Sequence, residues 1–189
     1  RQSSVFTVIN FFLEHSVFAI PLSFLTVIFV GTILLAMPDA SPNGTPISFI
    51  DALFTATSAT CVTGLVVRDT GTEFSLFGQI VILCLVQIGG LGLMTITAFF
   101  AITLGKRLTL SQNTNLRDYL DVTSIHDIKK MILFIMLSTF ICELLGFWAL
   151  TIVWKAHYSV PSELAFSALF HSISAFCNAG FSLNPDSIM

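Results

Sequence analysis

The sequence predicts an all-α membrane protein, built from repeated units of a spanning helix, a short re-entrant segment and a second span. Composition carries the first half of this prediction: of 189 residues, 54% are apolar and 10% are charged, with a mean hydropathy of +0.89. A soluble domain carries about 25% charged residues. The second half rests on the alternation of long and short apolar stretches. A net charge of −3 gives no sign of the basic face that a nucleic-acid partner needs.

Three stretches are long enough to cross a bilayer, which takes about 20 helical residues. Residues 17–37 carry no charge, and residues 74–105 form an uncharged run of 32 residues. Residues 131–154 carry one charge, Glu143. We expect each of the three to be a span.

Two other apolar stretches, residues 48–60 and 164–176, are 13 residues each. That is about 20 Å of helix, a length typical of re-entrant or buried helices rather than spans. Each ends in a strip of small residues around one glycine, Gly64 or Gly180.

Both short stretches begin with helix-start signals. Ser48 and Asp51 match the S-x-x-D pattern of a capping box. In the second stretch, Pro161-Ser162-Glu163 supplies a cap and an acid for the first turn.

The basic residues predict the orientation. Cytoplasmic loops of membrane proteins carry an excess of lysine and arginine, which places the segment between the second and third spans inside the cell and both short helices at the outer face. This segment holds five of the eight basic residues: Lys106, Arg107, Arg117, Lys129 and Lys130.

An internal repeat relates the two short stretches at an offset of 116 residues. ALFTATSATCVTGL, residues 52–65, aligns with ALFHSISAFCNAGF, residues 168–181, with seven of fourteen positions identical. The first and third spans fall at about the same offset. The repeated unit is therefore span, re-entrant helix, span, once complete and once truncated.

A short helix followed by an extended strip has a physical use inside a membrane. Such a strip exposes backbone carbonyls at membrane depth, where protein or water must surround them. Carbonyl oxygens can replace the hydration shell of a cation, and a helix C-terminus carries a partial negative charge. Glycine lets the strip adopt the necessary backbone angles. We expect a potassium-channel-like pore whose filter is lined by Thr60, Cys61, Val62, Thr63 and Gly64, and by Phe176, Cys177, Asn178, Ala179 and Gly180.

Four segments taken together resemble the Ktr/Trk/HKT superfamily of potassium transporters, in particular the membrane subunits of bacterial Ktr systems. They are TSATCVTGL, VVRDTGTEFSLFGQ, the glycine-rich QIGGLG at residues 87–92, and SAFCNAGFS. The resemblance covers nearly the whole chain. It implies four repeats around one pore, a filter glycine in each, and K⁺ as the transported ion, with Na⁺ as a second candidate. It also implies a homodimer that binds a KtrA-type cytoplasmic ring, and this partner rather than the chain itself would bind the regulatory nucleotide.

The sequence departs from this pattern in two ways. Its strips are simpler than the TVGYG filter of potassium channels, so selectivity is expected to be looser. It also contains neither an inner span for the second repeat nor a third and fourth repeat, where the superfamily has its gate. Because the chain starts at Arg1 and stops at Met189, both ends are expected to be cut.

The predicted organisation has four parts. Residues 1–16 form an N-terminal segment, and residues 17–105 the first repeat. Residues 106–130 form a cytoplasmic connection, in which residues 108–130 have the pattern of an amphipathic helix. Residues 131–189 form the second repeat without its inner span.

Several residues have two possible interpretations. Glu143 lies in the middle of a span, where a charged side chain is a functional candidate by default, although it could equally be protonated or hydrogen-bonded between helices. His171 is favoured as a packed side chain over a metal ligand. Small residues in spanning helices usually permit close packing, which is favoured over a gating hinge for Gly89, Gly90 and Gly92.

The cysteines lack metal-ligand spacing and lie in apolar runs, so they are predicted to be small buried hydrophobic residues. They are Cys61, Cys84, Cys142 and Cys177.

Three functional classes remain, and none is enzymatic. A cation channel explains the paired strips best. A secondary transporter of a small solute or Na⁺ is the alternative, because broken helices also build substrate sites near the midplane. A purely structural membrane subunit gives no reason for paired glycine strips.

Overall fold

The computed structural model describes residues 16–92, residue 95 and residues 125–184, and these residues are helical with no β-strand. They fall into two compact units. One unit comprises residues 26–91 and 138–189 and contains both glycine strips; the other comprises residues 1–25 and 92–137. All contacts described below lie in the first of these units.

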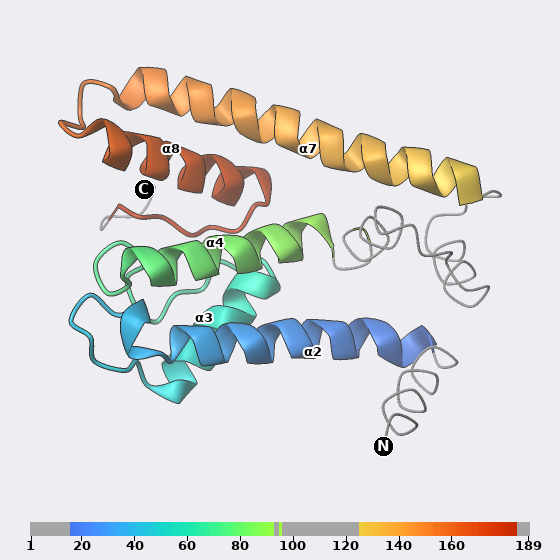
Figure 1. The fold of residues 1–189 in the computed structure, drawn as a ribbon, viewed down its shortest axis with the longest axis horizontal. Helices are drawn as coiled ribbons and strands as arrows, with labels where there is room; N and C mark the ends of the chain where they lie inside the picture. The colour runs from blue at the N-terminus through green and yellow to red at the C-terminus, as the bar shows by residue number, and fades with distance from the viewer. Residues whose placement is uncertain (1–15, 93–94, 96–124, 185–189) are drawn as a thin grey trace. The chain divides into compact units, whose positions relative to one another are not determined.

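The first predicted span is confirmed as a helix in α2, Ser16–Leu35 (Figure 1). Pro38 cannot continue a helix because it lacks a backbone N–H, and after α2 the chain makes the short 3₁₀-helix η1, Pro38–Ala40. The N-terminal segment that the sequence analysis placed before this span falls almost entirely outside the described residues.

The second predicted span begins as α4, Leu76–Leu91, which is shorter than the 32-residue apolar run. Gly92 follows with φ of +73°, a left-handed conformation typical of the residue that ends a helix. The predicted continuation to residue 105 lies mostly outside the described residues, as does most of the predicted amphipathic helix.

The third predicted span is α7, Ile125–Trp154, which begins six residues earlier than expected. Its residues 132–154 form the one helix within the described ranges that is long and apolar enough to cross a membrane. Shorter apolar helices cover Pro21–Leu35 and Leu76–Leu91.

The two short helices are α3, Phe49–Thr60, and α8, Pro161–Phe176. Their predicted starts need correction. Ser48 is the N-cap of α3 but makes no side-chain cap bond, and the Asp51 carboxylate binds Arg68, so the predicted capping box is not formed. The N-cap of α8 is Val160 rather than Ser162, because proline takes the first helical position.

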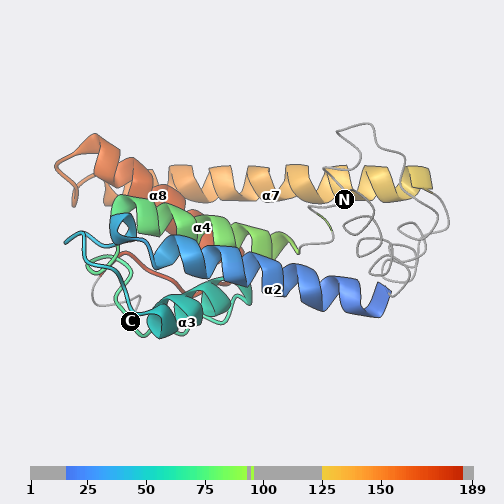
Figure 2. The same cartoon turned by 60° about the horizontal axis from the view of Figure 1, so that its bottom comes forward.

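Helix α4 is the central element of this unit, since it contacts η1, α3 and α8 (Figures 1 and 2). Its buried face includes Ile82 and Val86, both fully buried. Two glycines permit close approach: a Cβ at Gly31 of α2 would lie 2.7 Å from a Leu85 methyl, and a Cβ at Gly78 would lie 2.6 Å from the Ala40 carbonyl oxygen. The inner helix therefore packs closely against both α2 and η1.

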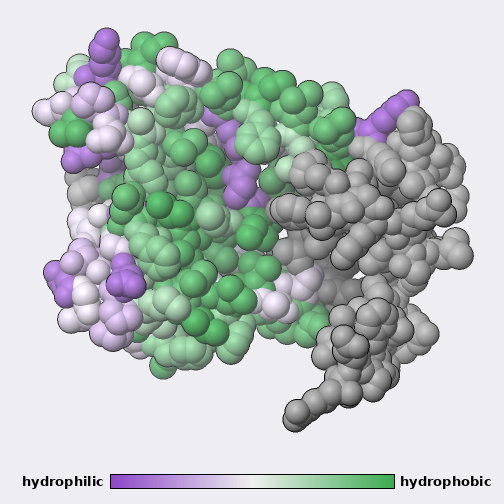
Figure 3. Space-filling view, viewed as in Figure 1, coloured by the Kyte–Doolittle hydropathy of each residue, from purple (hydrophilic) through white to green (hydrophobic). Residues whose placement is uncertain are grey.

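Hydrophobic residues cover most of the surface visible in Figure 3, and hydrophilic ones gather at the end where the loops before α4 and α8 lie. On α7, Phe134 and Ile152 are 70% and 72% exposed. Such a surface suits lipid or further protein rather than water.

The prediction that the cysteines are buried is wrong for most of them. Cys61, Cys84 and Cys142 are exposed, and Cys177 is partly buried. Apolar sequence runs do not imply burial in a membrane protein, because their side chains can face lipid instead of a protein core.

Candidate functional site

The chain leaves α3 and α8 through the same turn. After α3, the N–H groups of Cys61, Val62 and Thr63 donate to the carbonyls of Thr57, Ala59 and Ser58. After α8, the N–H groups of Cys177, Asn178 and Ala179 donate to the carbonyls of Ile173, Ala175 and Ser174. Each donor and each acceptor after α8 lies 116 residues beyond its counterpart after α3. The sequence repeat is therefore also a repeat of backbone geometry. The pattern is that of a Schellman motif, which ends a helix and redirects the chain.

The residue that makes each turn has an unusual conformation. Val62 and Asn178 both have φ of +56°. Asparagine tolerates this left-handed region, but a β-branched residue such as valine rarely enters it. Non-glycine residues held in this region store about 1–3 kcal/mol of strain, which is often found at functional sites. The sequence analysis missed this feature, because valine gives no signal for a left-handed turn.

The two glycines meet. Gly64 and Gly180 have φ of +76° and +72°, as a glycine-requiring strip predicts. A Cβ at Gly64 would lie 2.8 Å from the Ala179 carbonyl oxygen and 3.2 Å from the Gly180 Cα. A Cβ at Gly180 would lie 3.1 Å from the Gly64 Cα. The strips therefore approach each other through backbone. A side chain at Gly64 would force a backbone shift, and one at Gly180 would make a tight contact with the Gly64 Cα.

Equivalent serines tie the strips to their helices. Ser58 of α3 is 2.9 Å from the Thr63 hydroxyl, which donates to it, and Ser174 of α8 donates to the Phe181 carbonyl at 2.7 Å. Both serines are buried. These bonds fix the path of each strip just before or after its glycine.

The carbonyls of the strips themselves are free of internal partners. Within the described part of the chain, no N–H or hydroxyl donates to the carbonyls of residues 61–64 or 177–180. A carbonyl at membrane depth without a donor is costly. These eight oxygens are therefore available to an external partner, and a cation is one.

Helix α4 contacts the beginning of both strips through neighbouring glycines. A Cβ at Gly89 would clash with the Thr60 carbonyl oxygen, and one at Gly90 would clash with the Cys177 Sγ. These contacts agree with the packing interpretation of both residues. Thr60 is fully buried at the end of α3, so its carbonyl faces α4 at this point.

The predicted strip residues differ in exposure. Thr60 and Phe176 are the last residues of their helices. Ala179 is fully buried. The side chains or backbones of the remaining strip residues are at least partly exposed: Cys61, Val62, Thr63, Gly64, Cys177, Asn178 and Gly180.

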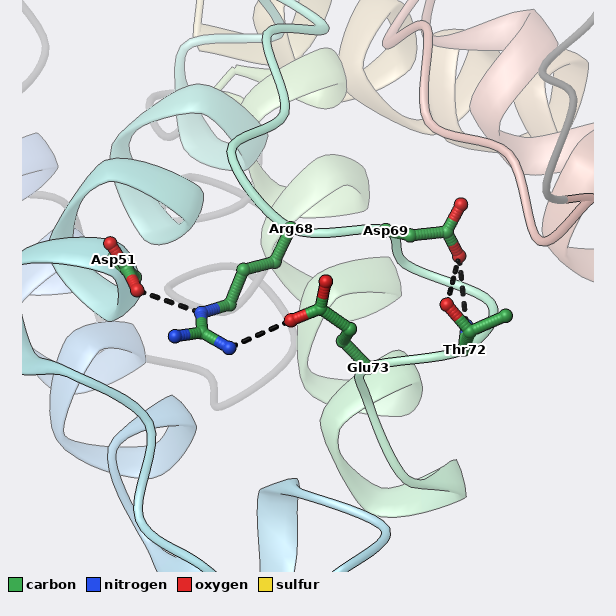
Figure 4. Close-up of polar contacts among 5 residues, drawn as sticks. All are labelled: Asp51, Arg68, Asp69, Thr72 and Glu73. Carbon is green, nitrogen blue, oxygen red and sulfur yellow. Dashed lines mark hydrogen bonds and ion pairs between the residues drawn. The ribbon is translucent and has the colours of Figure 1, made fainter.

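An ion-pair cluster holds the segment that follows the first strip (Figure 4). The Arg68 guanidinium donates from Nε to Asp51 and from Nη1 to Glu73, both at 2.7 Å. The hydrogen bond with Asp51, then that with Glu73, raises the pKa of Arg68 above its ordinary value. Asp69 caps its own turn by accepting from the Thr72 N–H at 2.8 Å and from its hydroxyl at 2.9 Å. The strip exit is thereby tied to the first turn of α3.

The second strip is held by a different residue. His171 Nδ1 lies 2.8 Å from the Ser167 carbonyl, which can only accept, so Nδ1 carries the hydrogen. Nε2 then accepts from the Ser182 hydroxyl at 3.1 Å and from the Leu183 N–H at 3.3 Å. The Trp154 ring packs edge-on at 5.0 Å. His171 is a packed side chain, and its contacts orient the chain after Gly180.

Glu143 is buried and bonded between helices. Its Oε1 accepts from the Gln87 Nε2 of α4 at 2.7 Å, and its backbone carbonyl accepts from the Ser172 hydroxyl of α8 at 2.6 Å. Of the interpretations left open by the sequence, the interhelical hydrogen bond is the one observed.

Among the described residues, no group of three or more His, Cys, Asp or Glu side chains has the arrangement of a metal site.

Comparison with known proteins gives the family. Residues 9–189 match the model of the TrkH family, described as cation transport protein. The chain belongs to the TrkH family. It is 45% identical over 166 residues to Ktr system potassium uptake protein B of Bacillus subtilis, and 44% identical over 168 residues to that of Vibrio alginolyticus. It is also 37% identical over 166 residues to the potassium/sodium uptake protein NtpJ of Enterococcus hirae.

These matches cover 88–89% of the chain but 36% of each relative, so the chain spans about a third of the length of these TrkH-family proteins. The resemblance drawn from the four sequence segments is confirmed. The family assignment makes the chain a cell-membrane protein related to ion transport proteins.

Proposed function

We propose that this chain forms part of a potassium-uptake pore, in which the strips 60–64 and 176–180 belong to a carbonyl-lined selectivity filter. The observation that supports this most directly is the set of free carbonyls at residues 61–64 and 177–180, placed around two glycines that meet backbone to backbone.

The chemistry fits a monovalent cation. A carbonyl ring replaces the hydration shell of an ion without offering it a full charge, so the ion can both enter and leave. The C-terminal ends of α3 and α8 add partial negative charge at the start of each strip. K⁺ is the ion named for the Ktr relatives, and the name of NtpJ adds sodium.

The rest of the assembly is part of the proposal. Four span–pore loop–span repeats surround one pore, the subunit pairs as a homodimer, and a cytoplasmic nucleotide-binding ring of the KtrA type controls it. The relatives named as parts of a Ktr system support the existence of a partner subunit. Residues 106–130 face the cytoplasm, near that ring.

The test is uptake by the full-length protein that contains this chain. It is purified with its regulatory subunit, reconstituted in liposomes, and assayed with labelled Rb⁺ as a substitute for K⁺ against K⁺ and Na⁺ competition. We expect saturable uptake that K⁺ inhibits at lower concentration than Na⁺. Absence of cation flux would refute the pore.

A secondary transporter gives a different result in the same assay. Uptake would then require a gradient of a coupled ion and would stop when that gradient is dissipated. Flux down the K⁺ gradient alone supports the pore.

A further inference from the structure

We propose that Glu143 and Gln87 are positioning residues for the second filter strip, acting together through the Gln87 amide. This inference rests on the proposed pore function. Neither residue belongs to a strip.

The argument starts from the carboxyl group. Glu143 is 5% exposed and lies on α7 beside an apolar groove lined by Phe140, Phe147 and Phe166. An unpartnered carboxylate in such surroundings is very costly. The Gln87 amide donates a hydrogen bond to it at 2.7 Å. This bond is short and charge-assisted when the carboxyl is ionised, and such bonds are the strong ones.

The bond fixes the orientation of the Gln87 amide. A carboxylate can only accept, so the amide must turn its NH₂ toward Glu143. Its carbonyl Oε1 then points the opposite way, where the Cys177 thiol lies 4.0 Å from it and can donate weakly. Gly90, one turn further along α4, removes the side chain that would otherwise collide with Cys177. Gln87 therefore connects α7 to the start of the second strip.

A second contact reinforces the connection. The Ser172 hydroxyl of α8 donates to the Glu143 backbone carbonyl at 2.6 Å, and a Cβ at Gly146 would clash with Ser172 Oγ. Residue 143 thus touches both the helix that leads into the second strip and the amide that contacts its start. The Ser172 bond involves the backbone of residue 143, so a change in the Glu143 side chain acts on the strip through Gln87 and its contact with Cys177.

The first strip has no equivalent arrangement, which provides the comparison. Position 27, 116 residues before Glu143, is Val27, and position 61, equivalent to Cys177, is exposed. The effect is therefore expected to be specific to the second strip, and to alter how the filter binds ions rather than whether the subunit folds.

The experiment measures Rb⁺ uptake by the full-length transporter with its regulatory subunit. Glu143→Leu removes the acceptor but fills most of the space, so its main cost is the Gln87 amide left without a partner. We expect the KM for K⁺ to rise on the order of tenfold, as for loss of a charged hydrogen bond, with reduced discrimination against Na⁺ and little change in Vmax. Glu143→Gln keeps an acceptor for the Gln87 amide and is expected to restore most of the affinity.

Coupling decides between positioning and general packing. The double variant Gln87→Leu/Glu143→Leu is expected to lose no more K⁺ affinity than either single variant, because both substitutions break the same hydrogen bond. Leu144→Ala, at an exposed neighbouring position on α7, serves as the control and should leave KM unchanged. Glu143→Met replaces Glu143→Leu if the latter is absent from membranes.

Any of three results would overturn the inference. Glu143→Leu could have the wild-type KM and selectivity, the losses of K⁺ affinity could add in the double variant, or Glu143→Gln could lose as much K⁺ affinity as Glu143→Leu. These three results can be interpreted only if the wild-type protein transports K⁺ in the same assay. If the wild-type protein shows no cation flux, the proposed pore function itself is refuted.

Discussion

At the scale of single residues, the two repeats share a backbone but not a set of side chains. The same hydrogen bonds end α3 and α8, and the same φ angles recur at the turn and at the glycine. The turn is made by Val62 in one strip and Asn178 in the other. What the repeats have in common is thus the direction of the carbonyls, as expected if backbone oxygens, and not side chains, bind the ion.

Substitution of Gly64 is expected to damage the filter. Gly64→Ser and Gly64→Asp force a side chain onto a φ of +76° and against the Ala179 carbonyl oxygen. The left-handed conformation costs roughly 1–2 kcal/mol. Displacement of the Ala179 carbonyl oxygen, a proposed ion ligand, should lower K⁺ affinity about tenfold. Because the contact is with the other strip, both strips shift. Uptake kinetics in K⁺ and Na⁺ measure the effect, and membrane abundance of the variant controls for folding.

Gly180→Ser should have a similar effect, since its Cβ would meet the Gly64 Cα at 3.1 Å. Gly44 is the matched control, because it also has a positive φ but a Cβ added there would have no atom within 4 Å. Gly44→Ser should carry the backbone strain without the change in selectivity. Wild-type affinity and wild-type discrimination in both the Gly64 and Gly180 variants would contradict the filter assignment.

At the scale of helices, α4 decides where the strips begin. Two adjacent glycines bring it against Thr60 at the end of α3 and Cys177 at the end of α8. A larger residue would push each helix end away. The packing of one inner helix therefore sets the positions of both strip entrances.

The two glycines are expected to differ in tolerance. Gly89→Ala places a methyl group against the Thr60 backbone carbonyl, which cannot rotate away. Gly90→Ala meets the Cys177 Sγ, which can rotate, and the Cys177 Cβ at 2.7 Å, a less severe overlap. We expect Gly89→Ala to lower the stability of the subunit by about 1–3 kcal/mol, as overpacking does, and Gly90→Ala to cost less. Thermal unfolding in detergent measures this. Equal stability of the two variants would show that the Thr60 contact is not tight.

The loop after the first strip offers a second test at this scale. Arg68→Ala removes both ion pairs that hold the loop to α3 and Glu73. These groups are partly exposed, and exposed ion pairs contribute little stability, so we expect normal abundance with a rise in KM of less than roughly fivefold. Arg68→Lys should recover part of the affinity, because it keeps the charge but not the two-pronged geometry. A variant with unchanged KM would show that the cluster does not position the strip.

At the scale of the whole molecule, orientation in the membrane follows from charge. The basic segment 106–130 is predicted to face the cytoplasm, and the polar loops before α3 and α4 are predicted to face outward. Under the proposed function, this orientation puts the strip exits at the outer face, the side from which K⁺ is taken up.

Labelling of introduced cysteines in the full-length protein tests the orientation. A membrane-impermeant maleimide added to intact cells is expected to label Asn43→Cys but not Ser111→Cys, and to label both after lysis. The parent protein gives the background from its native cysteines. Labelling of Ser111→Cys in intact cells would reverse the topology.

The sequence by itself determined the class and the family, and it predicted the two glycine strips as the candidate site. Apolar runs and glycine strips are local patterns that depend on neighbouring residues, and the 116-residue repeat is found by comparing the sequence with itself, without any knowledge of contacts. The positive φ of Gly64 and Gly180 was also predictable from the strips themselves. The hydrogen bonds at the start of α3 were not predictable in this way, because the Asp51 carboxylate binds Arg68, which lies 17 residues further along the chain.

Only the tertiary structure decided which groups meet. It brought Gly64 against Gly180 and placed Gln87 between Glu143 and Cys177. It also showed that His171 holds the chain after the second strip, as Arg68 holds the chain after the first. It also placed Val62 in a left-handed turn that its side chain disfavours. Several of these contacts join segments that are more than 50 residues apart in the sequence. Gln87 and Glu143, for example, are separated by 56 residues. Local sequence preferences carry no information about such contacts, because their energy arises only when the helices are assembled.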